Sequence, residues 1–315
     1  MRVRVLDLDG SIPRQATLMR SAQPLVHELR RWGPRIRLAC RFGRFAKFEK
    51  SLAKNLGEES PSEPTLTLFG SGDFHHVSLA LLRRQQRPFN LLVLDNHPDW
   101  MRAIPFLHCG TWLYHAARLP QVQQIFHVGG NMDFDNGFRR LAPWPLLRSG
   151  KIRVFPAMRY FRRRPWSEVA NEPVRPNADS LVTDLRLHEL LHPYRSQLEK
   201  YPLYISLDKD VMVVDDAVVN WDSGHLTLPE VEIVLSTFLA MARGNLAGMD
   251  ILGDWSAVQT GGLFRRYLHW TEHPALTIDP AQANRLNERT NLMLLNMMLK
   301  LQPAVPERAA VPLAA

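Results

Sequence analysis

The segment LLVLDNHPDW, residues Leu91 to Trp100, offers the clearest guide to this chain. Its apolar half predicts a buried strand, and its polar half places Asp95, His97 and Asp99 at alternate positions. Alternate residues of an extended chain point to the same side, so these three side chains are expected to face one point. Carboxylates and imidazoles are common ligands of divalent metals, so the segment indicates a metal site. The alternative is a strand that ends in a polar turn.

Two other segments repeat this arrangement of an apolar strand followed by metal-binding types of side chain. In LYISLDKDVM, Asp208 and Asp210 follow the strand at alternate positions. In LTLFGSGDFHHVSLALL, a strand leads through a glycine-containing turn to His75 and His76 at the start of a helix. Three strand ends with such ligands can together form a two-metal site with a bridging carboxylate.

Strand and helix patterns alternate along the chain, which predicts an α/β fold of three layers, α/β/α, with a mostly parallel sheet. Sheets of this kind bind ligands at the carboxyl ends of their strands, where all the proposed metal ligands fall. Thr227 and Glu230 predict a capping box at a helix start, and Ala281 to Leu301 predicts a long helix. We expect a single domain over residues 1–302 and a disordered tail over residues 303–315.

These motifs resemble those of the arginase and agmatinase (ureohydrolase) family, which shares its fold with the metal-dependent deacetylases. The family has Gly-Gly-Asp-His-Ser, Asp-x-His-x-Asp and Ser-x-Asp-x-Asp in this order, and this chain has GSGDFHHVS, DNHPD and SLDKD. The first motif contains one additional residue, Phe74, so His75 and His76 are both candidates for the family's ligand. The residues that follow align best with His75 in that place. The resemblance extends roughly from Thr65 to Trp255 and implies an arginase/deacetylase-like fold.

The resemblance also implies a hydrolase with two Mn²⁺ ions, and the all-oxygen and imidazole ligand set favours manganese over zinc. Asp95 and Asp208 are expected to bridge the two ions. His75 and Asp99 complete one site in this interpretation. The full ligand set that the resemblance implies is His75, Asp95, His97, Asp99, Asp208 and Asp210.

Two further positions are candidates for catalysis and substrate binding. His108, in the segment HCGTW, is similar to a family histidine that gives a proton to the leaving amine; the alternative is a buried structural histidine. In arginases and agmatinases a glutamate after the last sheet strand binds the guanidinium group. The aligned positions here hold Asp250, Gly253 and Asp254, and no glutamate. We expect Asp254 to take that catalytic and substrate-binding role, with Asp250 as a second substrate-binding candidate.

The expected substrate follows from a missing feature. The segment WMRAIPFL, Trp100 to Leu107, lacks the Asn and Ser that hold free arginine in arginases. The chain is similar to a divergent subgroup that includes peptide arginases, which implies hydrolysis of arginine side chains in a ribosomally made peptide to ornithine and urea. One alternative is a related metallohydrolase that acts on another C–N bond, of a free guanidino or amidino compound or of an acetyl-amine. The other is a basic, non-catalytic binding protein with the same fold.

Composition excludes several other classes of protein. The net charge is +8, but no nucleic-acid-binding module accompanies the basic and aromatic residues between His27 and Ala53, so we expect a peptide or guanidino partner and no nucleic acid. The two cysteines, Cys40 and Cys109, argue against a disulfide framework and predict a cytoplasmic protein. Neither a transmembrane segment nor a signal-peptide core is present, so we expect no membrane association. The sequence leaves the oligomeric state open.

Two segments have alternative interpretations. Asp7-Leu8-Asp9-Gly10 is how haloacid-dehalogenase-type phosphatases begin, but the later histidine-containing motifs do not fit that mechanism, so we interpret it as a first strand. The run from Arg162 to Arg164 lies in a basic, proline-bearing insertion, which predicts a loop with a solvated surface.

Overall fold

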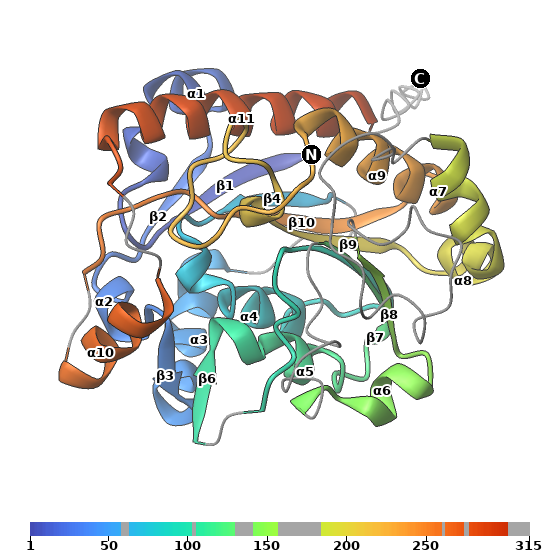
Figure 1. The fold of residues 1–315 in the computed structure, drawn as a ribbon, viewed down its shortest axis with the longest axis horizontal. Coiled ribbons are helices and arrows are strands. Elements are labelled where there is room, and N and C mark those ends of the chain that lie inside the picture. The colour runs from blue at the N-terminus through green and yellow to red at the C-terminus, as the bar shows by residue number, and fades with distance from the viewer. Residues whose placement is uncertain are drawn as a thin grey trace, which may run out of the picture.

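The computed structural model describes residues 1–57, 63–102, 105–129, 141–156, 184–259, 262–273 and 277–301. Within these residues, eight parallel strands form one sheet in the order β2-β1-β4-β10-β9-β5-β7-β8. Helices cover both faces of this sheet (Figure 1). The predicted three-layer fold with a mostly parallel sheet is therefore confirmed. The basic insertion at Arg162 to Arg164 and the tail over residues 303–315 lie outside the described residues.

The central strands are apolar throughout because helices cover them on both sides, as is usual for parallel sheets. Every residue of β5 and β9 is buried. A separate antiparallel ribbon pairs β3, Ala39–Arg41, with β6, Phe106–His108. The strands of the main sheet are β1 Arg2–Asp7, β2 Leu25–Glu28, β4 Thr65–Leu68, β5 Phe89–Leu94, β7 Val122–Gly129, β8 Ile152–Pro156, β9 Leu203–Asp208 and β10 Leu246–Leu252.

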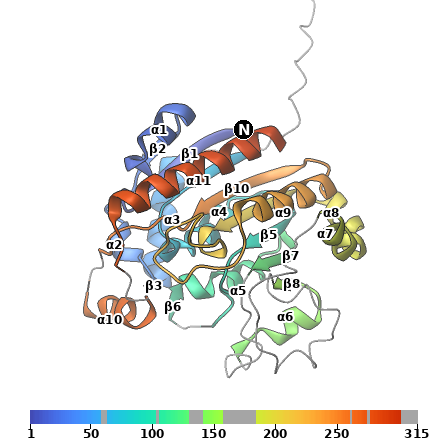
Figure 2. The same ribbon diagram turned by 45° about the horizontal axis from the view of Figure 1, so that its top comes forward.

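Two hydrophobic clusters, one on each face of the sheet, form the core. The helices packed in the first cluster are α1 Ala16–Ala22, α7 Asp184–Leu191, α8 Arg195–Lys200, α9 Leu228–Met241 and α11 Pro280–Leu301. Those packed in or against the second are α2 Gly33–Ile36, α3 Phe42–Leu56, α4 Val77–Arg83, α5 Trp112–Ala116 and α6 Trp144–Arg148. The turned view in Figure 2 shows α11 lying along the sheet next to α1, and α10, Leu263–Glu272, lying apart from it near α2 and β3.

Local sequence signals explain where several helices begin. Thr227 and Glu230 form the predicted capping box at the start of α9, with Glu230 Oε2 accepting from the Thr227 amide at 2.8 Å. The long helix predicted near the C-terminus is α11. Between Asp184 and Lys200, a short 3₁₀ turn separates α7 from α8, because Pro193 interrupts the α-helical hydrogen bonding. In the described part of the chain, no helix is long and apolar enough to cross a membrane.

The N-terminal DLDG motif follows the first strand, at the carboxyl edge of the sheet. Asp7 accepts hydrogen bonds from Arg30 Nε at 2.6 Å and from the Gly10 amide at 2.9 Å. Asp9 accepts from the Ser71 amide and from the Ser256 hydroxyl. Both carboxylates thus bind neighbouring segments of the protein, which agrees with the structural interpretation of this motif.

Candidate metal centre

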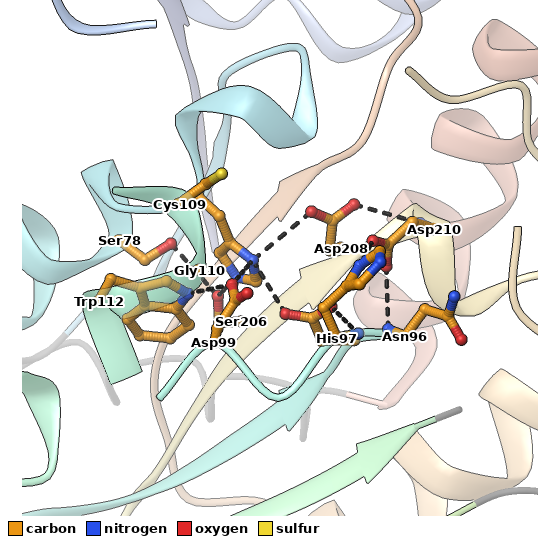
Figure 3. Close-up of polar contacts among 12 residues, drawn as sticks. Ser78, Asn96, His97, Asp99, Cys109, Gly110, Trp112, Ser206, Asp208 and Asp210 are labelled. Atoms are coloured by element: carbon orange, nitrogen blue, oxygen red, sulfur yellow. Dashed lines mark hydrogen bonds and ion pairs between the residues drawn. The ribbon is translucent and has the colours of Figure 1, made fainter. Parts of the chain in front are cut away.

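The predicted ligands gather where three strands of the sheet end. Asp95 directly follows β5, and Asp208 ends β9. Asp210 lies in the 3₁₀ turn η6, Lys209–Val211, and the turn η2, Gly72–Phe74, follows β4 and leads to His75. Because β4, β9 and β5 are parallel, their carboxyl ends lie at one edge of the sheet, and Figure 3 shows side chains from these segments pointing toward one another.

Three side chains form a first group of metal-ligand atoms. His75 Nδ1 lies 3.1 Å from Asp95 Oδ2 and 3.0 Å from Asp99 Oδ2. The ligand atoms of this group all lie within 4.8 Å of one another. Asp99 is held in place by the indole of Trp112, whose Nε1 donates to Asp99 Oδ2 at 2.7 Å. The three residues are buried.

A second group consists of Asp95, His97 and Asp210, so Asp95 belongs to both. His97 Nδ1 lies 2.8 Å from Asp210 Oδ2 and 3.8 Å from Asp95 Oδ1. Asp208 lies between the groups: its Oδ2 is 3.5 Å from His75 Nδ1, and its Oδ1 accepts from the Asp210 amide at 3.1 Å. The structure thus brings all six predicted ligands together. Their binding of metal stays a prediction.

The chemistry of this cluster fits divalent cations. It contains four buried carboxylates, Asp95, Asp99, Asp208 and Asp210, and among the described residues no lysine or arginine lines the cavity beside them. Asp95 Oδ2 is buried and lacks a hydrogen-bond donor other than the ring of His75. Unneutralised carboxylates are costly to bury, and oxygen and imidazole ligands suit Mn²⁺ or a similar ion.

The crowding of carboxylates changes the protonation of both histidines. Although burial opposes the charged ring, the Asp210 carboxylate and its neighbours raise the pKa of His97 to about 10. Asp95 and Asp99 likewise raise the pKa of His75, against the effect of its burial. Burial and the adjacent Asp210 raise the pKa of Asp208 well above its usual range. Without metal, the folded protein therefore binds more protons here than the unfolded chain does.

This difference predicts that the metal-free protein loses stability as pH rises. The His97 contribution is complete below about pH 6.5, its value in the unfolded chain, and is lost as pH approaches 10. Between pH 6.5 and 9 we expect the unfolding free energy of the chelated protein to fall by a few kcal/mol, since each pKa unit corresponds to about 1.4 kcal/mol. Calorimetry of chelated and Mn²⁺-loaded protein tests this. Bound cations replace the protons as balancing charge, so equal pH slopes in both forms would contradict the expectation.

The structure separates the two adjacent histidines of the first motif. His75 faces the carboxylates, whereas His76 is fully buried against Phe45, at 5.9 Å between ring centroids. Burial, with a smaller effect from His108, lowers the pKa of His76 to about 3, so its ring is neutral. The geometry therefore favours His75 over His76 as the ligand.

Asp250, predicted to bind substrate, lies behind His75 and not in the cavity. Its buried carboxylate accepts from the hydroxyls of Ser206 at 2.7 Å, Ser78 at 3.0 Å and Tyr204 at 3.0 Å. Ser206 Oγ in turn lies 3.1 Å from His75 Nε2. This chain of hydrogen bonds keeps Nδ1 of His75 directed at the carboxylates. The substrate-binding role expected for Asp250 does not fit this position.

Asp254, the other predicted substrate-binding residue, is also absent from the cavity wall. It is buried, and its Oδ2 lies 3.0 Å from Lys209 Nζ. Gln15 and Asn291 donate to its Oδ1 at 2.6 and 3.1 Å. Its charge is therefore satisfied inside the protein, and the catalytic role expected for it does not fit. No side chain fits at Gly253 either, because a Cβ there would lie 2.4 Å from Asp208 Oδ1 and the backbone has a φ of +94°.

A cavity of about 120 Å³ lies over the six predicted ligands. His108 is part of its wall, and its Nδ1 accepts from the Gly110 amide at 3.0 Å. The sequence did not identify Trp221, which lines the cavity and packs edge-on against His97 at 5.5 Å. The remaining wall residues are mostly apolar or small: Gly72, Pro98, Trp100, Met101, Cys109, Gly110, Leu141 and Ala142.

Comparison with solved structures supports this architecture. The proclavaminate amidino hydrolase from Streptomyces clavuligerus has a TM-score of 0.57 at 16% identity, covering 96% of this chain and 92% of that one. The arginases from Bacillus cereus and Helicobacter pylori have TM-scores of 0.57 and 0.56 at 15% and 13% identity, each covering 96% of this chain and 99% of the other. This chain has the arginase fold. The predicted resemblance to ureohydrolases is thus confirmed in the fold.

Comparison of amino-acid sequences gives less information about this chain than comparison of structures. No protein-family model matches the chain. An uncharacterized protein from Thermotoga maritima is 28% identical over 195 residues. That match covers 62% of this chain and 60% of the Thermotoga protein.

Proposed function

We propose that this chain is a two-metal hydrolase that cleaves a guanidino C–N bond, converting arginine side chains of a peptide to ornithine with release of urea. The observation that carries the proposal is the pair of His/Asp groups that share Asp95 beneath a cavity, on an arginase fold. Two divalent cations, proposed to be Mn²⁺, would be held by the six predicted ligands and supply Lewis-acid activation of water. Cys40 and Cys109 are both buried and are not joined in a disulfide, which supports the expected cytoplasmic location.

The shape of the cavity supports a side chain as the reacting group. Trp100, Met101 and Trp221 give it apolar walls, which suit the aliphatic stem of an arginine. A peptide would then lie outside, with only the arginine side chain inserted.

His108 is the proposed proton donor to the leaving amine. In the resting, neutral ring Nδ1 accepts from the Gly110 amide and Nε2 carries the proton. To act as an acid the ring must first take up a second proton at Nδ1, which replaces this hydrogen bond. It then gives the Nε2 proton to the leaving amine and returns to the neutral form. Thr111 fixes the backbone at this point, since its Oγ1 both accepts from the amide and donates to the carbonyl of His108 at 2.9 Å. The ring is thereby held in the cavity wall in one tautomer.

Replacing His108 by glutamine is expected to lower kcat by 10²–10⁴-fold, the usual contribution of a general acid. KM and Mn²⁺ stoichiometry should change little, because His108 belongs to neither ligand group. Steady-state kinetics and metal analysis measure both. His115→Gln on α5 is the matched control, because His115 lies outside the cavity and packs against Phe42. A similar loss of kcat in both variants would argue against a proton-donating role.

A second candidate function is hydrolysis of an acylated amine. The position of Asp254 favours it. The Asp254 carboxylate is paired with Lys209 and does not line the cavity, so it does not supply the carboxylate that was expected to bind a guanidinium group there. Among the described residues, the four ligand aspartates are the only carboxylates that line the cavity. A neutral acyl-amine group requires no such partner.

One experiment separates the two candidates. The Mn²⁺-loaded protein is incubated with an arginine-containing peptide, an acetyl-lysine-containing peptide, free arginine and agmatine, and both urea and acetate are measured. We expect urea from the arginine peptide, and none from Asp210→Ala protein. Acetate alone would support the second function. Neither product, from protein carrying two metal ions, would overturn both.

A further inference from the structure

The turn that carries two of the predicted ligands is anchored by the residue between them. Lys209 is fully buried, and its Nζ lies 3.0 Å from Asp254 Oδ2 at the end of β10. Asp208 and Asp210, on either side of it, line the cavity, whereas Lys209 does not. Consecutive side chains of η6 thus serve two different sites, the metal cluster and a buried ion pair.

Asp254 is itself fixed by residues from both ends of the described chain. Gln15, which precedes α1, donates to Asp254 Oδ1 at 2.6 Å, and Asn291 of α11 donates to the same oxygen at 3.1 Å. Asn291 also donates to Gln15 Oε1 at 2.8 Å. All three polar side chains are at most 1% exposed. The carboxylate that holds Lys209 therefore has little freedom to move.

The end of β10 also packs directly on the predicted ligands. Gly253 lies so close that a Cβ would meet Asp208 Oδ1 at 2.4 Å and the Lys209 amide at 2.6 Å. The Gly253 and Asp254 amides both donate to the carbonyl of Gly70, the first residue of the GSGDFHHVS motif. The β10 terminus therefore bridges the segments that supply His75 and Asp208.

Stability alone does not account for this arrangement. A buried ion pair is usually no more stable than apolar side chains of the same size, because both charges lose their hydration. What a buried pair provides is a defined geometry, since each charge must meet its partner. At Lys209 that geometry sets the path of the backbone between two ligands.

We infer that Lys209 and Asp254 are a positioning pair, which fixes η6 so that Asp208 and Asp210 present their carboxylates to the proposed metal centre. The inference rests on the proposed function. It assigns to Asp254, one of the positions that align with the family's glutamate, a role other than binding the substrate. It also connects α11 to the metal centre through Asn291.

The test uses Mn²⁺ binding and not turnover. We compare Lys209→Met, Asp254→Asn and the double variant Lys209→Met/Asp254→Leu with the unmodified protein. Calorimetric titration gives Mn²⁺ affinity, electron paramagnetic resonance reports the coupling of paired Mn²⁺ ions, and circular dichroism gives the thermal midpoint. Thr290→Val is the matched control, because Thr290 is a buried polar residue of α11 whose hydroxyl bonds to the Asp216 carbonyl instead.

We expect the single variants to lose stability and to bind Mn²⁺ about 10- to 100-fold more weakly, the usual effect of removing a group that orients metal ligands. The double variant is decisive, because it removes both charges and should recover part of the lost stability. The remaining loss reflects the Gln15 and Asn291 donors, which lose their acceptor. Under the inference it keeps the weak Mn²⁺ affinity and the altered resonance signal. Recovery of the wild-type affinity and resonance signal would overturn the inference and leave the pair a purely structural contact.

The wild-type titration separates this inference from the function on which it rests. Two Mn²⁺ ions bound with coupled spins, together with unchanged binding in the double variant, would refute only the positioning role. Absence of Mn²⁺ binding in the unmodified protein would refute the proposed two-metal function and the inference with it.

Discussion

Replacing Asp95 by alanine is expected to abolish turnover, with a loss on the order of 10³-fold or more, and to lower Mn²⁺ stoichiometry below two. Asp95 is the residue common to both ligand groups, so its loss affects each proposed ion. Its side chain also positions the next ligand, since Asp95 Oδ1 accepts from the His97 amide at 2.7 Å. Metal analysis and product assays measure the two effects.

The same replacement should stabilise the metal-free protein. Burial raises the pKa of Asp210, and the charge of the neighbouring Asp95 raises it further. Removing Asp95 relieves this repulsion among the four crowded carboxylates. The thermal midpoint of the chelated Asp95→Ala protein should therefore equal or exceed that of the chelated wild type. Asp215→Ala, at an exposed aspartate in the loop after η6, is the control for charge alone. Two bound Mn²⁺ ions and normal turnover in Asp95→Ala would contradict the proposed centre.

Replacing Arg37 by methionine is expected to destabilise the protein by about 3–5 kcal/mol, the typical cost of leaving a buried charge without its partner. Arg37 is 1% exposed and its Nε lies 2.5 Å from Oδ2 of the fully buried Asp73. Asp73 Oδ1 also accepts from Trp221 Nε1 at 3.1 Å and lies 2.7 Å from His273 Nε2. The pair thus joins the segment after β4 to a wall of the cavity.

Denaturation in urea at pH 7 measures this loss, with Arg35→Met as a control at an exposed arginine of α2. The wild-type pair should also be sensitive to acid. Burial tends to raise the pKa of Asp73, but Arg37 and His273 together hold it well below its usual range. A depressed pKa contributes stability above about pH 4 that is lost as pH falls further. Equal urea midpoints for Arg37→Met and Arg35→Met would show that the pair contributes little.

The parts of the molecule that the sequence predicted well are those controlled by local pattern. Alternation after an apolar strand identified Asp95, His97 and Asp99 as residues of one centre. The backbone after β5 is not extended, since Asn96 and His97 form a bend and Asp99 has a φ of +49°, so His97 and Asp99 belong to different ligand groups that share Asp95. The rule that parallel strands bind ligands at their carboxyl ends then brought Asp208 and Asp210 to the same edge. Both steps depend on neighbouring residues and on general properties of sheets, so the fold and the cluster followed from sequence.

The errors concern residues whose partners are distant in the chain. Asp254 is satisfied by Lys209 and Gln15, and the second of these lies 239 residues away. No local pattern indicates such a pairing, so its carboxylate was assigned to the substrate. Arg37 lies among the basic and aromatic residues between His27 and Ala53, and no local pattern distinguishes it from them, yet it is buried against Asp73. The inserted Phe74 also left His75 and His76 as two candidates for one metal ligand, and the position of His75 after η2 distinguishes them only in the structure.

The strand order carries a consequence for how the chain folds. Of the strands that the structure describes, β10 is the last in the chain, yet it lies in the middle of the sheet, between β4 and β9. Until residues Leu246 to Leu252 are available, the earlier strands form two separate sheets, and each has a buried strand as an open edge. Such unpaired edges favour association with other chains, and long-range pairing of this kind folds slowly. The nascent chain is therefore expected to be most prone to aggregation just before β10 is added, and to depend on chaperones at that stage.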